Sequence, residues 1–172
     1  GAAAAVSMNL VPCSDGSDMM GSCRNPAAFT NLYGYRPTPG IIPELREKSD
    51  VRKMPIFSTT GVISRTPKDL CYYMNCVAGK DQNDESSIET NYSFLEINNL
   101  KIPEIFQIGW LNDLCEKYDF ENGILSMCHK ALKDISQIDK NIRVEINNDD
   151  LSTELLWKNW TTIRSKIIYD DL

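Results

Sequence analysis

The feature of this 172-residue sequence that most constrains its fold is an apolar stripe in the C-terminal half. Between residues 124 and 138, apolar side chains recur at alternating intervals of four and three, which places them on one face of an α-helix. A second stripe with the same spacing runs from residue 156 to residue 167. Each helix needs an apolar surface to cover its stripe, so we expect the two to pack together and residues 103–169 to hold most of the core. The stripes comprise Ile124, Cys128, Ala131, Ile135 and Ile138, and then Leu156, Trp160, Ile163 and Ile167.

Thr66 marks the clearest start of a further helix. Its hydroxyl can cap the first turn, and Pro67 suits the first helical position because it has no N–H to satisfy. Asp69 lies where an acidic side chain reaches back to the cap, and Gly79 supplies a stop. The sequence therefore predicts a helix between Thr66 and Gly79.

Shorter elements follow from other local patterns. Apolar and polar residues alternate over 142–146, which predicts a strand. Residues 103–118 begin with a proline and then keep one face apolar, which predicts a helix. Residues 55–64 are compatible with a short hairpin, and residues 88–97 fit a strand, with a helix as the alternative.

The N-terminal third shows no lasting periodicity. Residues 6–65 are rich in Ser, Gly, Asn and Pro, which predicts an irregular, extended arm with a few short strands. We interpret Gly1–Ala5 as a cloning remnant. Residues 66–172 should form a mainly helical globular body of about four helices. The predicted fold class is therefore α+β, with a helical C-terminal body and an irregular N-terminal arm.

Charge is unevenly distributed along the chain. The net charge is −6, but the first 68 residues carry more basic than acidic side chains. An acidic body repels phosphate backbones, so we expect protein partners, and nucleic-acid binding only through the basic arm. The sequence has no run of 18 apolar residues, and we expect no membrane association.

The six cysteines bear on the compartment. An even number would suit three disulfides in a secreted protein. This chain is long enough to fold without them, and Cys115 and Cys128 fall on expected apolar helix faces, where free thiols pack well. We therefore favour an intracellular protein, with a secreted or virus-encoded, disulfide-stabilised binding protein as the alternative. The cysteines are Cys13, Cys23, Cys71, Cys76, Cys115 and Cys128.

Residues that could carry chemistry are sparse. His129, the one histidine, is expected at a helix edge with no nucleophile beside it. Cys71 and Cys76 could bind metal together with His129 and a fourth ligand, but their spacing differs from that of structural zinc sites. Known phosphate-binding and hydrolase motifs do not occur in the sequence. The sequence thus predicts no catalytic residue, metal or cofactor, and an enzyme with dispersed site residues is the third hypothesis.

The leading hypothesis is a non-enzymatic protein–protein interaction module, a scaffold-like subunit or fragment of a larger assembly. In the arm, Tyr33, Tyr35 and Arg36 are interleaved with glycine and proline, a composition that leaves aromatic rings free to dock. Trp157 is turned about 100° from Leu156 on its helix, so it should be exposed and could anchor a partner. Tyr33, Tyr35, Arg36 and Trp157 are therefore the predicted partner-binding residues.

Overall fold

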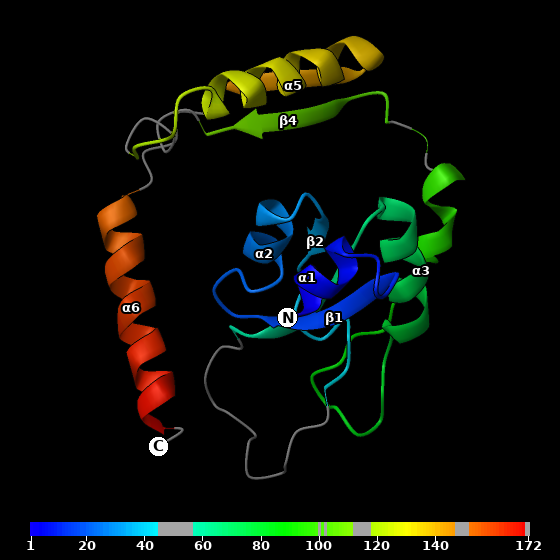
Figure 1. Ribbon diagram of the computed structural model, residues 1–172, viewed down its shortest axis with the longest axis vertical. Helices are drawn as coiled ribbons and strands as arrows, with labels where there is room; N and C mark the ends of the chain where they lie inside the picture. Colours follow the sequence, from blue (N-terminus) through cyan, green and yellow to red (C-terminus); the bar gives the residue numbers. More distant parts are fainter. Residues whose placement is uncertain (45–56, 100, 102, 112–117, 147–151, 171–172) are drawn as a thin grey trace. The chain divides into compact units, whose positions relative to one another are not determined.

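The computed structural model divides the chain into two units, Gly1–Leu100 and Lys101–Leu172 (Figure 1). Each unit has its own sheet. The residues that the structure describes are 1–44, 57–99, 101, 103–111, 118–146 and 152–170.

A three-stranded antiparallel sheet organises the first unit. Its order is β1 (Cys13–Asp18), β3 (Thr59–Ser64) and β2 (Tyr33–Tyr35), so β3 is central. β1 pairs along its whole length with β3, from Cys13 opposite Ser64 to Asp18 opposite Thr59. The central strand is the most deeply buried, as expected for a strand with neighbours on both edges.

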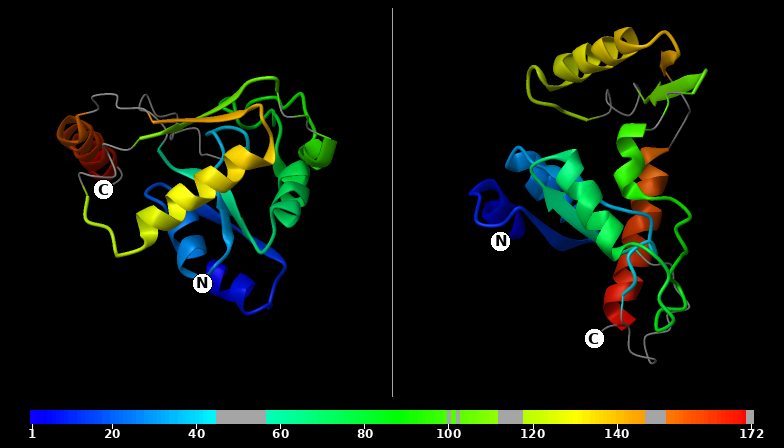
Figure 2. Two further views of the ribbon diagram at one scale, coloured as in Figure 1. Left: turned by 90° about the horizontal axis from the view of Figure 1, so that it is seen from above. Right: turned by 90° about the vertical axis from the view of Figure 1, so that its right-hand side faces the viewer.

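Helices cover both faces of this sheet. Successive residues of a strand point to opposite faces, and Ile63 packs with α1 (Ala2–Ser7) and α2 (Arg24–Phe29) while Val62 packs with α3 (Pro67–Val77). The 3₁₀ helix η2 (Phe94–Asn99) lies against α3 on that second side (Figure 2). The first unit is therefore a helix–sheet–helix sandwich with one apolar cluster on each face of the sheet. The cluster on the α1 and α2 side contains Ala3, Cys23, Ala27 and Ile63, and the cluster on the α3 side contains Ile42, Val62 and Met74.

The second unit contains a strand–helix–strand crossover. β4 (Phe106–Trp110) and β5 (Ile142–Ile146) are parallel, with Phe106 opposite Ile142 and Trp110 opposite Ile146. α5 (Ile124–Ile138) connects them and packs on β5, and α6 (Thr153–Asp170) follows. No residue of α5 is buried, although the helix is strongly amphipathic. Its apolar face thus remains largely accessible in the described residues.

Four predicted elements are confirmed, and one of them is α6 (Thr153–Asp170), which contains the predicted stripe from Leu156 to Ile167. α3 begins as expected, with Thr66 Oγ1 accepting a hydrogen bond from the backbone N–H of Asp69 at 3.0 Å. α5 spans the predicted stripe from Ile124 to Ile138, and β5 spans the predicted strand from Ile142 to Ile146. Each of these segments carries a strong local signal, which explains why the sequence alone was sufficient.

The predicted fold class is wrong. Within residues 6–65, expected to be an irregular arm with a few short strands, lie all three strands of the sheet and α2. The N-terminal alanines form α1, in which Ala3 and Val6 are buried, so they pack as part of the fold. The pairing of β1 with β3 supplies the order that a strand of small polar residues cannot show locally. Most of the buried apolar residues consequently lie in the first unit, and not in residues 103–169.

Three further local predictions are also wrong. Residues 106–110 form a strand within the predicted 103–118 helix, because alternate apolar residues there pair with β5, while residues 112–117 lie outside the described residues. Residues 94–99 form a 3₁₀ helix in place of the expected strand. The predicted hairpin at 55–64 is instead one strand, β3, which begins at Thr59, and residues 55–56 are outside the described part.

Among the described residues, no helix combines the length and the apolar character that crossing a membrane requires.

The fit between α2 and β2 yields a first prediction. A methyl group added at Gly34 would lie 2.6 Å from the carbonyl oxygen of Cys23 and 2.8 Å from Cβ of Ala27. Gly34→Ala should therefore push α2 off the sheet and lower the free energy of unfolding by about 2 kcal/mol. Urea denaturation followed by circular dichroism measures this loss.

Gly109→Ala is the control, because a methyl group there meets nothing within 4 Å. It should change the free energy of unfolding by less than about 0.5 kcal/mol. Equal unfolding curves for wild type and Gly34→Ala would contradict the close contact between α2 and β2.

Candidate active site

A loop of five residues, Met19–Cys23, joins the end of β1 to the start of α2. It carries two adjacent side chains of the nucleophilic kind, Ser22 and Cys23. Ser22 is exposed, whereas Cys23 is fully buried. Ser22 and Cys23 are neighbours in sequence, but one side chain is exposed to solvent and the other is buried, so their reactivities differ.

The carboxylate of Asp18, at the end of β1, holds the loop in place. Its Oδ1 accepts a hydrogen bond from the backbone N–H of Gly21 at 2.7 Å, and its Oδ2 accepts one from the N–H of Cys23 at 3.3 Å. Gly21 has a φ of +103°, a left-handed conformation that favours glycine. The peptide units before Gly21 and after Ser22 are thus fixed to one buried side chain.

Two arginines neutralise the buried carboxylate. Arg24 donates from Nε at 2.9 Å and from Nη2 at 3.0 Å, the paired geometry that suits a guanidinium and a carboxylate. The Nε of Arg36 lies 3.7 Å from Oδ1 of Asp18 and donates to the backbone oxygen of Asp18 at 3.3 Å. The hydrogen bond from Arg24 lowers the pKa of Asp18 well below its usual range, although burial acts in the opposite direction.

The buried Cys23 side chain packs against the sheet. Its thiol donates to the carbonyl oxygen of Gly16 at 3.2 Å, and its sulfur would lie 3.2 Å from a Cβ at Gly16 and 3.1 Å from one at Gly61. Burial, followed by the charge of Asp18, raises the pKa of the Cys23 thiol. Because the thiolate is the reactive form, this buried thiol is a poor nucleophile.

Ser22 has the accessibility that Cys23 lacks. Its hydroxyl forms no hydrogen bond with the residues that the structure describes. Within the same described part of the chain, the backbone N–H groups of Met20 and Ser22 also donate to no acceptor. In acyl transfer, an exposed hydroxyl attacks a carbonyl carbon, and N–H donors beside it stabilise the resulting oxyanion. The Ser22 loop has both features.

The predicted partner-binding residues do not gather at one place in the first unit's structure. Arg36 belongs to the Asp18 cluster, where it also donates to the carbonyl oxygen of Phe57 at 2.8 Å. Tyr35, next to it on β2, packs against the apolar cluster on the α3 side, and burial raises the pKa of its phenol. Tyr33 is 52% exposed. In the second unit, Trp157 is 66% exposed on α6 and stacks on Trp160 with ring centroids 5.4 Å apart.

The described residues hold no group of three or more metal-binding side chains. His129 lies on α5 with its ring 5.5 Å from that of Trp110, while Cys71 is buried in α3 and Cys76 is exposed. The five described cysteines are free thiols, so the described chain gives no support to a disulfide framework.

Sequence reasoning missed Ser22 and Asp18. The available signal was an acid at Asp18 and a base at Arg24 that enclose a Gly21–Ser22 pair at the start of a short helix. Such a set of small and charged residues has no helical or strand period, so a search based on periodicity assigns it to an irregular segment.

Comparison with known proteins gives a consistent result. The family model described as Amidase matches residues 1–163. A glutamyl-tRNA(Gln) amidotransferase subunit of Legionella pneumophila (strain Corby) is 31% identical over 157 residues, which is 91% of this chain and 31% of the relative. The subunit of the same name from Thermotoga maritima is 28% identical over 154 residues, 85% of this chain and 30% of the relative. The chain thus spans about a third of the length of these curated relatives.

Solved structures agree on the fold. A bacterial aryl acylamidase of the amidase signature enzymes family superposes with a TM-score of 0.77 at 27% identity, covering 92% of this chain and 32% of that one. The crystal structure of the Thermotoga maritima amidotransferase subunit superposes with a TM-score of 0.68 at 22% identity, covering 97% and 40% of the two chains, and supports the fold alone.

These findings overturn the expected function. A non-enzymatic interaction module, its disulfide-stabilised alternative and the expectation that the protein is not an enzyme are all wrong at the level of the family, because the matched family consists of amidases. The physical reason for the error is that Asp18, Ser22 and Arg24 lie in a short segment without helical or strand periodicity, and that only the fold brings Arg36 onto Asp18.

A second prediction concerns Asp18, whose side chain is 0% exposed. Asp18→Asn keeps the shape but leaves two arginines without their buried anion, so it should lower the free energy of unfolding by about 3 kcal/mol at pH 7. The folded-state pKa lies below the unfolded value, so the stabilisation by Asp18 is present above about pH 4 and is lost as the pH falls toward the folded pKa.

Chemical denaturation at a series of pH values between 7 and 3 tests this. The unfolding free energy of the wild type should fall more steeply below about pH 4 than that of Asp18→Asn. Parallel pH curves would contradict the assigned role of the Asp18 carboxylate.

Proposed function

We propose, from the premise that this chain belongs to the Amidase family, that it supplies the nucleophile of an enzyme that cleaves carboxylic amides, and that this nucleophile is Ser22. The observation that carries the proposal is the exposed Ser22 hydroxyl on a loop fixed by Asp18. The premise alone names a family, whereas this geometry names a side chain.

The proposed chemistry begins with attack of Ser22 Oγ on the amide carbonyl carbon. The new C–O bond turns the carbonyl oxygen into an oxyanion, which the N–H groups of Met20 and Ser22 are available to bind. The C–N bond then breaks, the nitrogen leaves after gaining a proton, and an ester of Ser22 remains. Attack of water on that ester, or of another acceptor, releases the acyl group and restores the hydroxyl.

Rigidity favours this role for the loop. Oxyanion donors act best when they are already oriented, because then no reorganisation is needed during the reaction. The two bonds from Gly21 and Cys23 to Asp18 restrain the peptide units that flank the Gly21–Ser22 pair. The adjacent Cys23 restrains the same loop, because its side chain fills the space over Gly16 and Gly61.

The hydroxyl of Ser22 also needs a proton acceptor. The described residues place no base in hydrogen-bond contact with it. The curated relatives are about three times as long as this chain, so we propose that the acceptor lies in a part of the intact protein beyond these 172 residues.

Two substrate classes are candidates. The curated relatives named above are subunits of a glutamyl-tRNA(Gln) amidotransferase, and the structure with a TM-score of 0.77 is an aryl acylamidase. We favour the amidotransferase class because the curated relatives matched over 91% and 85% of this chain both carry that name. In that class the amide cleaved at Ser22 would be the nitrogen donor.

Replacement of the nucleophile tests the proposal in the intact protein that carries this chain. Ser22→Ala should reduce amide cleavage by about 1,000-fold or more, because no other described side chain on the loop can replace the hydroxyl. Ammonia release from glutamine and aniline release from an aryl acylamide measure cleavage in the two candidate classes.

Ser17→Ala is the matched control, since Ser17 is also exposed and lies on β1 one residue before Asp18. It should keep activity within about twofold of the wild type. Full activity in Ser22→Ala with unchanged thermal stability would disprove the assignment of Ser22.

We also propose that the intact protein works within a multi-subunit complex, which the word subunit in the names of its relatives supports. The predicted contact at Trp157 is consistent with this, because its ring is exposed and held by stacking on Trp160. Trp157→Ala should weaken co-purification of the partner protein by about tenfold, as for an aromatic anchor.

Tyr169→Ala provides the comparison on the same helix, since Tyr169 is 75% exposed. Analytical size-exclusion chromatography of both variants gives the readout. Identical elution of wild type and Trp157→Ala as the complex would remove Trp157 from the interface.

A further inference from the structure

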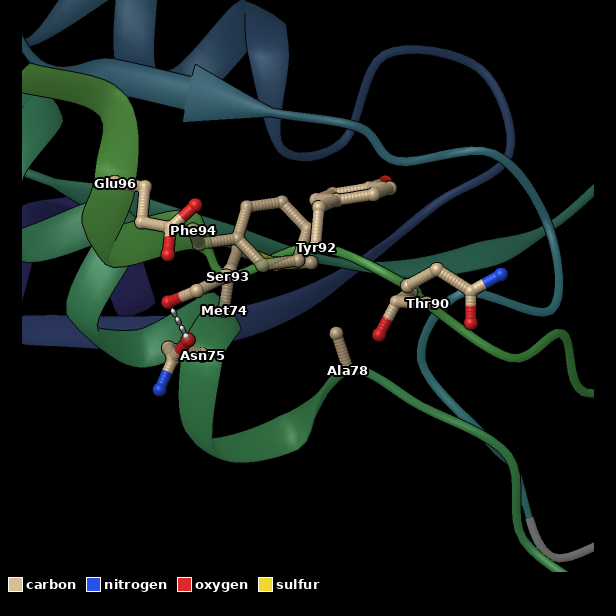
Figure 3. Close-up of a pocket in the computed structure, with 9 residues that line it drawn as sticks. Met74, Asn75, Ala78, Thr90, Tyr92, Ser93, Phe94 and Glu96 are labelled. Carbon is tan, nitrogen blue, oxygen red and sulfur yellow. Dashed lines mark hydrogen bonds between the residues drawn. The ribbon is translucent and has the colours of Figure 1, made fainter. Parts of the chain in front are cut away.

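A hollow of about 470 Å³ opens between the C-terminal half of α3 and the segment from Thr90 to Glu96. Figure 3 shows Glu96, Ser93 and Asn75 on one side of it and Thr90 on the other, with aromatic rings between them. We propose that this hollow binds a small organic cation, an alkylammonium group, between the Glu96 carboxylate and the neighbouring rings. The proposal does not depend on Ser22.

The rings of Tyr92 and Phe94 form the electron-rich part of an otherwise mostly polar lining. Tyr92 and Phe94 lie edge to face, with centroids 5.3 Å apart and planes at 62°. Phe94 packs with the apolar cluster around Met74, which fixes its position, whereas Tyr92 is 57% exposed. An exposed tyrosine face attracts an ammonium group through its ring electrons.

The charge of the residues that line the hollow determines whether a cation or an anion binds better. Glu96 is the one charged residue among those that line the hollow, and no lysine or arginine is among them. Its carboxylate makes no hydrogen bond or ion pair with the residues that the structure describes. An anion would meet this negative charge without compensation, while a cation would gain from both the carboxylate and the rings.

A hydrogen bond already organises the polar side of the hollow. Ser93 Oγ donates to Oδ1 of Asn75 at 2.9 Å, and the same Oγ accepts from the N–H of Leu95 at 3.2 Å. These bonds tie the start of η2 to α3 before any ligand arrives. A site assembled in advance loses less freedom when the ligand binds.

The exposure of Glu96 sets the expected strength. Water screens an exposed carboxylate, so the attraction is modest, and we expect a dissociation constant of about 1 mM for a small ammonium ion. An alkyl chain that covers Tyr92 should strengthen binding relative to ammonium alone.

The test uses n-butylammonium as the probe and 1-butanol as its uncharged counterpart. Saturation-transfer NMR on the intact protein that carries this chain should detect n-butylammonium, with about tenfold weaker binding of 1-butanol. Glu96→Gln, which keeps the size of the side chain, should weaken n-butylammonium about fivefold. Tyr92→Leu should weaken it to a similar extent.

Glu89→Gln is the matched control, because Glu89 is an exposed acid one residue before this segment and does not line the hollow. It should leave the affinity within about twofold of the wild type. Equal affinity for n-butylammonium and 1-butanol would overturn the proposal. So would an equal loss of n-butylammonium affinity in Glu89→Gln and Glu96→Gln, or no binding of n-butylammonium at about 20 mM. Thermal denaturation of Glu96→Gln should match that of the wild type, which separates lost binding from lost folding.

Discussion

The buried carboxylate of Asp18 is the interaction on which the rest of the first unit depends. Asp18 is the last residue of β1, and its carboxylate accepts hydrogen bonds from two backbone N–H groups of the following loop. It also pairs with Arg24 from α2 and with Arg36, which follows β2. A charge buried to this extent is tolerated only when it is paired and hydrogen-bonded. Asp18 meets both conditions, and in doing so it connects two strands, one helix and the loop that presents Ser22.

Close packing of small residues complements this charge cluster. Cys23 lies directly over Gly16 of β1 and Gly61 of β3, and α2 approaches β2 at Gly34. Glycine at these positions lets a six-residue helix lie almost on the backbone of the sheet. The short helix α2 would be marginal in isolation, so its order follows from this contact and from Arg24. The loop before α2 is restrained by the same contacts.

The second unit differs in how little it buries. α5 has a strongly apolar face yet no buried residue, and Met127 and Ile138 are 66% and 74% exposed. The parallel pair β4 and β5 has only one hydrogen-bonded neighbour for each strand among the described residues, whereas parallel sheets are ordinarily covered on both faces. This unit therefore shows clear secondary structure with little core of its own, the reverse of the first unit, where weak local signals accompany a well-buried sheet.

The sequence by itself determined the elements whose signals are local. The cap at Thr66 and Pro67 predicted the start of α3, the apolar period predicted α5, and alternation predicted β5. These depend on backbone sterics and on side-chain spacing within one segment, which neighbouring residues alone specify. Tertiary structure decided β1, β2 and β4 and the site around Ser22. A strand such as Cys13–Asp18, made mostly of small polar residues, becomes ordered only when β3 supplies hydrogen-bond partners. Asp18 gains its second arginine only when Arg36, eighteen residues away, folds back onto it.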